Sequence, residues 1–197
     1  MAHETGDWTL TEAARLLDEP QHRLIYLCEK GVVEPDLQDA EGRGSSRRFS
    51  SRNLLELAVA LRLRDLELPA TLIGAVVHVM RAFEAAVGRE IRGFRLPESL
   101  QAKNAPDLRV VIGDGRRLYF TLGAAGGPPK VYGGIDLDGL KEGTTAAGSR
   151  PKLRLVKPAP PPGRASGADD FGGPERSRHT RVEISVTHIA QDLPLEV

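Results

Sequence analysis

Apolar residues recur along the chain with two different periods. From Trp8 to about Arg92 they are spaced at intervals of three and four residues, which is typical of helices with one buried face. From about Pro106 onward, short runs rich in β-branched and aromatic residues are separated by glycines and prolines, which indicates strands joined by turns. This change of period predicts an α+β protein: about four helices followed by a small antiparallel β region.

Two short helices are expected near the N-terminus. Thr9 and Glu12 have the spacing of a capping box, which predicts that a helix begins at Leu10. A second helix is expected from Pro20 to Lys30, because proline is favoured at a helix start and glycine follows at the end. Its apolar positions leave polar side chains on the outward face, namely His22, Arg23, Tyr26 and Lys30. Two such helices fit either a helix-turn-helix or a plain helical hairpin.

The next segment concentrates positive charge. Residues 42–53, GRGSSRRFSSRN, hold four arginines and no carboxylate, although 27 basic and 27 acidic residues balance over the whole chain. Because the net charge is zero, any contact with nucleic acid must come from a local patch. A glycine-rich tip between two extended pieces is typical of a small β-wing, whose arginines can bind phosphates. Solvated surface and a flexible linker are the alternatives.

Two longer helices are expected after this segment. One begins at Ser50 or Ser51 and continues through NLLELAVALRLRDLEL with leucines around most of its circumference, so we expect it to be buried. Pro69 begins another, whose apolar stripe indicates core packing in preference to a dimer seam. The stripe consists of Leu72, Val76, Met80, Phe83 and Val87.

The order of these elements resembles the winged-helix DNA-binding domain of the MerR family of bacterial regulators. The resemblance rests on WTLTEAARLL, RLIYLCEKGVVEP, SRRFS and NLLELAVALRLRDLELPATLIGAVV, and covers roughly residues 8–80. Its most specific pieces are the helix exit Gly31–Pro35 and the wing end Arg47–Ser50. The family's arginine and two aromatics on the recognition helix correspond here to Ile25–Leu27. The resemblance implies that the second helix enters the DNA major groove; a weaker resemblance is to MerR-like domains fused to antitoxin-type C-terminal domains.

The C-terminal half predicts a small sheet. DLRVVIGDGRRLYFTLG has the pattern of a hairpin, KVYGGIDL and KLRLV add two strands, and RVEISVTHIA alternates like a returning strand. The intervening residues hold five prolines and four glycines in 23 positions, which predicts a disordered linker. We therefore expect four segments: a winged helix-turn-helix, a β domain, the linker and a final strand, at residues 1–92, 93–157, 158–180 and 181–197.

The sequence contains no pattern typical of catalysis or of a cofactor site. Phosphate-binding loops, zinc-protease helices, nucleophile elbows and dinucleotide fingerprints are all absent, and the histidines lack metal-ligand spacing. We expect no enzyme, no cofactor and no metal. The single cysteine, Cys28, fits a reducing compartment. No apolar run reaches the roughly 20 residues of a membrane span, so we expect a cytoplasmic protein without a membrane partner.

These observations favour a sequence-specific transcriptional regulator that binds double-stranded DNA. A homodimer is expected, because one such domain reads only a few base pairs. The residues expected to contact DNA are Gln21, His22, Arg23, Tyr26, Lys30, Arg43, Ser45, Arg47 and Arg48. The alternative is an antitoxin-like or adaptor module that binds a protein partner through its β region. The acidic residues Asp36, Asp39 and Glu41, beside the expected wing, favour that alternative.

Overall fold

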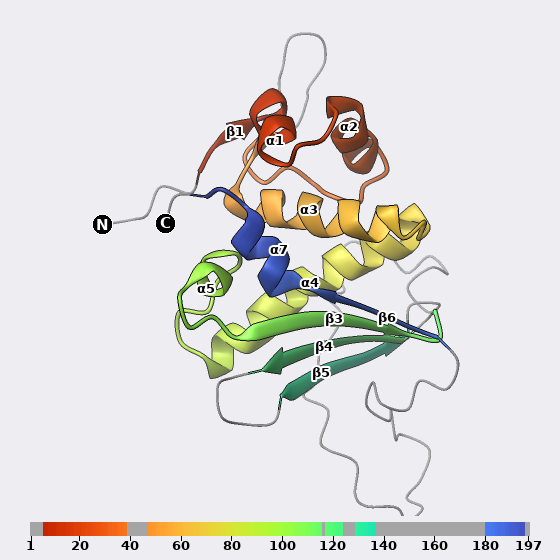
Figure 1. Cartoon of the computed structure of the whole chain (residues 1–197), viewed down its shortest axis with the longest axis vertical. Coiled ribbons are helices and arrows are strands. Elements are labelled where there is room, and N and C mark those ends of the chain that lie inside the picture. The colour runs from red at the N-terminus through yellow and green to blue at the C-terminus, as the bar shows by residue number, and fades with distance from the viewer. Residues whose placement is uncertain (1–5, 39–46, 116, 124–128, 137–179, 196–197) are drawn as a thin grey trace, which may run out of the picture.

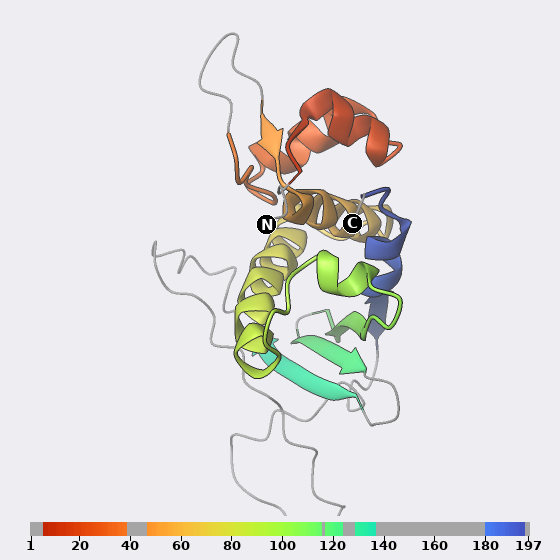
Figure 2. The same cartoon turned by 90° about the vertical axis from the view of Figure 1, so that its left-hand side faces the viewer.

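A computed structural model describes residues 6–38, 47–115, 117–123, 129–136 and 180–195 of the chain. In two perpendicular views the N-terminal helices lie at one end and the sheet, which has four strands, lies at the other; one long helix lies between them and a second runs from it alongside the sheet (Figures 1 and 2). The protein is therefore α+β, as the sequence predicts.

The first two helices are α1 (Leu10–Leu16) and α2 (Gln21–Glu29). The predicted capping box is confirmed, because the Thr9 hydroxyl accepts a hydrogen bond from the Glu12 amide at 3.3 Å while the Glu12 carboxylate accepts one from the Thr9 amide at 2.8 Å. Gly31 follows α2 with a φ of +64°, a left-handed conformation that glycine adopts easily. Pro20 precedes α2 as its cap instead of serving as its first residue.

A two-stranded ribbon closes over α1. Strand β1 (Trp8–Thr9) pairs antiparallel with β2 (Arg48–Phe49), with Trp8 opposite Phe49. The backbones of Gln38 and Arg48 form an isolated antiparallel bridge with N···O distances of 2.8 and 3.4 Å. The two ends of the expected wing are therefore paired, whereas its tip, residues 39–46, lies outside the described residues.

Two long helices form the centre of the molecule. Helix α3 (Ser51–Asp65) begins at a capping box between Ser50 and Asn53, and eleven of its residues are buried, as expected for a scaffold helix. Helix α4 (Ala70–Glu90) follows Pro69. All five residues of its predicted stripe are at most 4% exposed, which confirms the core-packing interpretation.

Helix α4 also has the length and apolar composition that a membrane span requires, contrary to the expectation from the apolar runs. Nine of its side chains are buried in this fold. Phe83 stacks on Phe120 at 4.8 Å between ring centroids and meets Tyr132 and Phe94 edge-on at 5.3 and 6.2 Å. Packing within the protein thus buries the apolar stripe of α4.

The sheet is fully antiparallel, in the order β5-β4-β3-β6. The predicted hairpin is confirmed, with Asp114 and Gly115 in the left-handed region at φ of +51° and +69°. The strand expected in KVYGGIDL is also present, whereas the segments expected as the KLRLV strand and the linker (except Thr180) lie outside the described residues. The four strands are β3 (Asp107–Gly113), β4 (Arg117–Gly123), β5 (Lys130–Asp136) and β6 (Arg181–Ser185).

The expectation that RVEISVTHIA is one strand is wrong after Ser185. The chain continues as helix α7 (Val186–Asp192), because the Ser185 hydroxyl caps it by accepting a hydrogen bond from the amide of His188 at 3.2 Å. Thr187 also donates its hydroxyl to the carbonyl of Pro106 at 2.8 Å. A further short helix that was not predicted, α5 (Glu98–Gln101), packs beside α7.

The helical region and the sheet share one hydrophobic cluster, which runs in sequence from Ala13 to Leu193. Leu108, Val110 and Ile112 of β3 belong to it together with the stripe of α4. The apolar core is therefore continuous across residue 92, where the composition predicts a domain boundary.

The aromatic cluster around Phe83 gives a prediction about stability. Replacing Phe83 with alanine (Phe83→Ala) is expected to lower the free energy of unfolding by about 3–5 kcal/mol, because three rings lose their shared partner and a cavity remains. Urea denaturation measures this decrease. The control is His78→Ala on the exposed side of the same helix, expected to change stability by less than about 0.5 kcal/mol. Equal decreases in the free energy of unfolding of both variants would contradict the conclusion that Phe83 is the central ring of the aromatic cluster.

Candidate nucleic-acid interface

The predicted recognition helix lies at one end of the molecule. In both views α1, α2 and β2 lie on the side of α3 that is opposite the sheet (Figures 1 and 2). On α2, Gln21 and His22 are exposed, and the Gln21 side-chain amide donates a hydrogen bond to the Thr11 hydroxyl at 3.2 Å. These two side chains are accessible from outside, as expected.

Arg23 does not reach outward as the sequence predicts. It lies against α3, where its guanidinium donates to Glu19 at 2.8 Å and to Asp65 at 2.7 Å. The hydrogen bond to Asp65, followed by the interactions with Glu19, raises the pKa of Arg23. The reason is helical geometry: Arg23 shares a face with Tyr26 and Leu27, and this face packs against the C-terminal half of α3. Arg23 therefore joins α2 to α3 and is not free to read bases.

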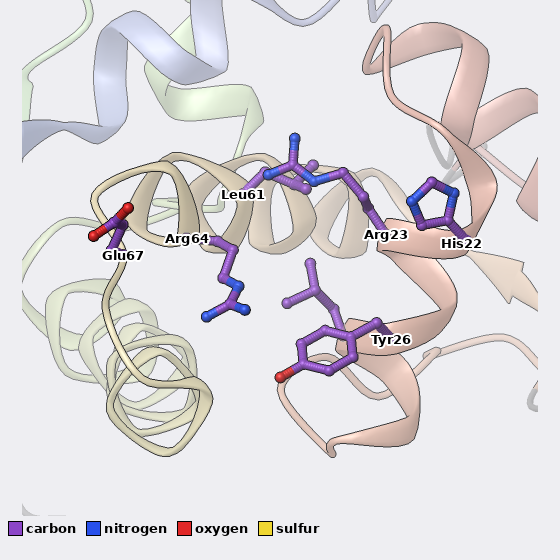
Figure 3. A pocket seen from close by; sticks show the side chains of 7 residues that line it. His22, Arg23, Tyr26, Leu61, Arg64 and Glu67 are labelled. Atoms are coloured by element: carbon purple, nitrogen blue, oxygen red, sulfur yellow. The ribbon is translucent and has the colours of Figure 1, made fainter.

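Tyr26 lies half-buried in a groove between α2 and α3 (Figure 3). The groove has a volume of about 740 Å³. The Arg64 guanidinium points into it and lies 5.6 Å from the centre of the Tyr26 ring, and the Lys30 ammonium lies 5.8 Å from the same ring. Within the described part of the chain neither cation forms a salt bridge; Arg64 makes only a long hydrogen bond, 3.5 Å, to the carbonyl of Leu68. We call Lys30, Tyr26 and Arg64 the groove cluster.

The expected wing arginines lie in different environments. Arg48 is bound by the exposed carboxylate of Asp7, through a hydrogen bond of 2.7 Å to Oδ1 and a second, very short contact to Oδ2. The hydrogen bond from Arg48 lowers the pKa of Asp7. Arg47 is half-buried at the base of the loop and also has interactions within the protein. Arg43 and Ser45 lie outside the described residues.

Residues 6–38, which include α1 and α2, carry more acidic than basic side chains. Residues 6–38 contain three basic side chains, Arg15, Arg23 and Lys30. They contain seven acidic ones, Asp7, Glu12, Asp18, Glu19, Glu29, Glu34 and Asp36. Four of these carboxylates already accept hydrogen bonds within the protein, those of Asp7, Glu12, Glu19 and Asp36. The groove cluster is therefore a local cationic site within an acidic surrounding.

Arg64 is the residue that sequence analysis missed. The sequence RLRD at residues 62–65 shows that charged side chains interrupt the leucines of α3, but it does not show which of them faces α2. Arg62 does not line the Tyr26 groove but a second one, together with Asp18, Asp65 and Asp192. Among the described residues, no group of three or more His, Cys, Asp or Glu side chains is arranged to hold a metal ion.

The placement of Arg23 gives a second prediction. Arg23→Met, which keeps much of the apolar stem, is expected to lower the free energy of unfolding by about 0.5–1 kcal/mol, since two half-exposed ion pairs are removed. This decrease in the free energy of unfolding should be smaller at 1 M salt, because salt screens exposed ion pairs. Thermal unfolding at low and high salt measures it. The control is Arg15→Met on the exposed face of α1, and a salt-independent deficit would mean that the substitution disturbs packing, not charge, at Arg23.

No model of a known protein family matches the chain, and no curated protein sequence matches it significantly. The interpretation of this surface therefore depends on the placement, exposure and charge of its own residues.

Proposed function

We propose that this protein binds double-stranded DNA as a transcriptional regulator, with α2 as the recognition helix of a winged helix-turn-helix. The observation that carries the proposal is the groove cluster, which brings Lys30, Arg64 and the aromatic ring of Tyr26 together beside an exposed recognition helix. Cations without carboxylate partners bind phosphates at little internal cost.

The arrangement of the backbone supports the same interpretation. A tight turn joins α1 to α2, and the loop that follows closes through the bridge between Gln38 and Arg48. This is the chain order of a helix-turn-helix with a wing, whose second helix is narrow enough for the major groove. Helix α3 packs against both α2 and β2, so it holds the helix and the base of the loop in a fixed relation.

The residues take different roles from those expected at first. Gln21 and His22 approach base edges, because they are exposed at the start of α2. Lys30 and Arg64 bind phosphates, with Arg43 and Arg47 extending this binding along the wing. Arg23 and Arg48 hold α2 and the loop in place through Glu19, Asp65 and Asp7. The active form is a homodimer, since two half-sites are needed for adequate specificity.

A second candidate function is a protein-interaction module. The excess of carboxylates in residues 6–38 opposes the approach of a phosphate backbone, and it favours this alternative. Among the described strands β5 and β6 form the two edges of the sheet, where a partner strand could add by backbone hydrogen bonds. In this case the helix-turn-helix is a scaffold.

The groove cluster gives a third prediction. In the variant Lys30→Ala/Arg64→Ala the slope of log affinity for duplex DNA against log salt concentration is expected to fall in magnitude by about 0.9 for each phosphate that the protein no longer neutralises. Fluorescence anisotropy of a labelled duplex, titrated at several salt concentrations, measures the slope. The matched control is Arg62→Ala, which removes one positive charge from α3 outside the groove cluster. A slope that stays at the wild-type value would exclude the groove cluster from the interface.

Selection of bound fragments from a random DNA pool distinguishes the two candidate functions. A regulator is expected to enrich a short motif with two-fold symmetry, because two recognition helices related by a dimer axis read it. A protein-interaction module enriches no motif and is not retained on heparin at physiological salt. The latter result would reject the DNA-binding proposal.

A further inference from the structure

An ion pair between the buried Glu56 and the half-exposed Arg81 joins the two central helices. Glu56 of α3 is completely buried, and its carboxylate accepts two hydrogen bonds from Arg81 of α4, at 2.6 Å from Nε and 2.7 Å from Nη2. Asn53 donates a third hydrogen bond to Glu56 at 3.0 Å. Burial raises the pKa of Glu56, and the hydrogen bonds from Arg81 oppose this shift. A buried charge with three donors is a costly feature that hydrophobic residues of similar size can often replace without a decrease in stability.

The same donors also hold the start of the loop that leads to β2. Residues 34–36, which we call the entry segment, follow the exit from α2. The carbonyl of Glu34 accepts hydrogen bonds from Arg81 at 3.1 Å and from Asn53 at 3.0 Å. The amide of Asp36 donates to Asn53 at 2.7 Å. The Asp36 carboxylate accepts from the Ser50 hydroxyl at 2.9 Å and lies 3.6 Å from Arg81.

Arg81 is the member of this network that belongs to α4. Two residues further along the helix, Phe83 stacks on Phe120 of the sheet and contacts Tyr132. A single turn of α4 is therefore bonded on one side to the entry segment and packed on the other side against β4 and β5. Any change in the position of α4 on the sheet displaces the Arg81 guanidinium relative to Glu34 and Asp36.

We propose that Arg81 is a positioning residue that fixes the entry segment, and with it the bridge between Gln38 and Arg48, according to the position of α4 on the sheet. The proposal rests on the proposed function and goes beyond it, because it assigns to the buried pair a role in coupling the C-terminal sheet to the DNA-binding end. An ion pair whose carboxylate is buried favours the one geometry in which that carboxylate keeps its donors. Coupling through such a network typically changes affinity by factors between about 2 and 30.

The test separates positioning from folding. Arg81→Met leaves Glu56 buried without its cation, so both the free energy of unfolding and the DNA affinity are expected to fall, the affinity by about tenfold. The double variant Glu56→Gln/Arg81→Met has no unpaired carboxylate at position 56, so its free energy of unfolding is expected to recover. The affinity is expected to remain low, because the entry segment still lacks the bonds from Arg81. The matched control is Arg109→Met on β3, another half-exposed arginine with two carboxylate partners, Asp107 and Glu183, which is expected to leave the affinity unchanged.

A second measurement does not depend on DNA. A fluorophore is attached to Gln38→Cys in a Cys28→Ser background, next to the entry segment and on an exposed side chain. Its anisotropy is expected to fall in Arg81→Met and in the double variant, and to stay at the wild-type value in Arg109→Met. Recovery of DNA affinity in the double variant, or an anisotropy that Arg81→Met does not change, overturns the proposal. If the wild-type protein binds no DNA, the proposed function fails separately and the anisotropy alone decides whether Arg81 fixes the entry segment.

Discussion

The structure depends on the requirement that α3 be covered on nearly all sides. Eleven of its fifteen residues are buried, including the charged Glu56. The N-terminal helices and β2 cover one side, α4 covers another, and α7 covers a third. Because a helix with leucines around most of its circumference is unstable in water, these elements must assemble around it together. The N-terminal helices and the sheet thus share one hydrophobic core.

The same constraint determines which charges remain available. Two arginines that point toward α3 or toward the N-terminal segment form salt bridges there. Arg23 pairs with Asp65, and Arg48 pairs with Asp7. Arg64 and Lys30 lie over the Tyr26 ring and have no such partner in the described part of the chain. The positive charge available for binding at this end therefore comes from Lys30 and Arg64 and not from the whole surface. For such a surface, local geometry outweighs net charge in deciding what it binds.

Much of the fold could be predicted from local patterns. The capping boxes, the ends of the helices at glycine and proline, the apolar stripe of α4 and the β3–β4 hairpin all depend on neighbouring residues. The prediction failed at α7, where RVEIS and the following residues alternate like a strand while Val186, Ala190 and Leu193 also have helical spacing; the cap at Ser185 decides between them. The site was harder to predict because its partners are distant in sequence. The ion pair between Arg23 and Asp65 spans 42 positions, and no local pattern shows which face of α3 meets α2.

The position of α7 has a consequence for how the chain folds during synthesis. Ile189 and Leu193 approach Ala58 and Leu61 of α3, although more than 120 positions separate the two helices in sequence. As the ribosome releases the chain from its N-terminus, α1 to α4 emerge first and one apolar side of α3 stays exposed to water. That side is covered only when α7 has been made. Until then the nascent chain exposes Ala58 and Leu61 of α3, which is the kind of apolar surface that molecular chaperones bind.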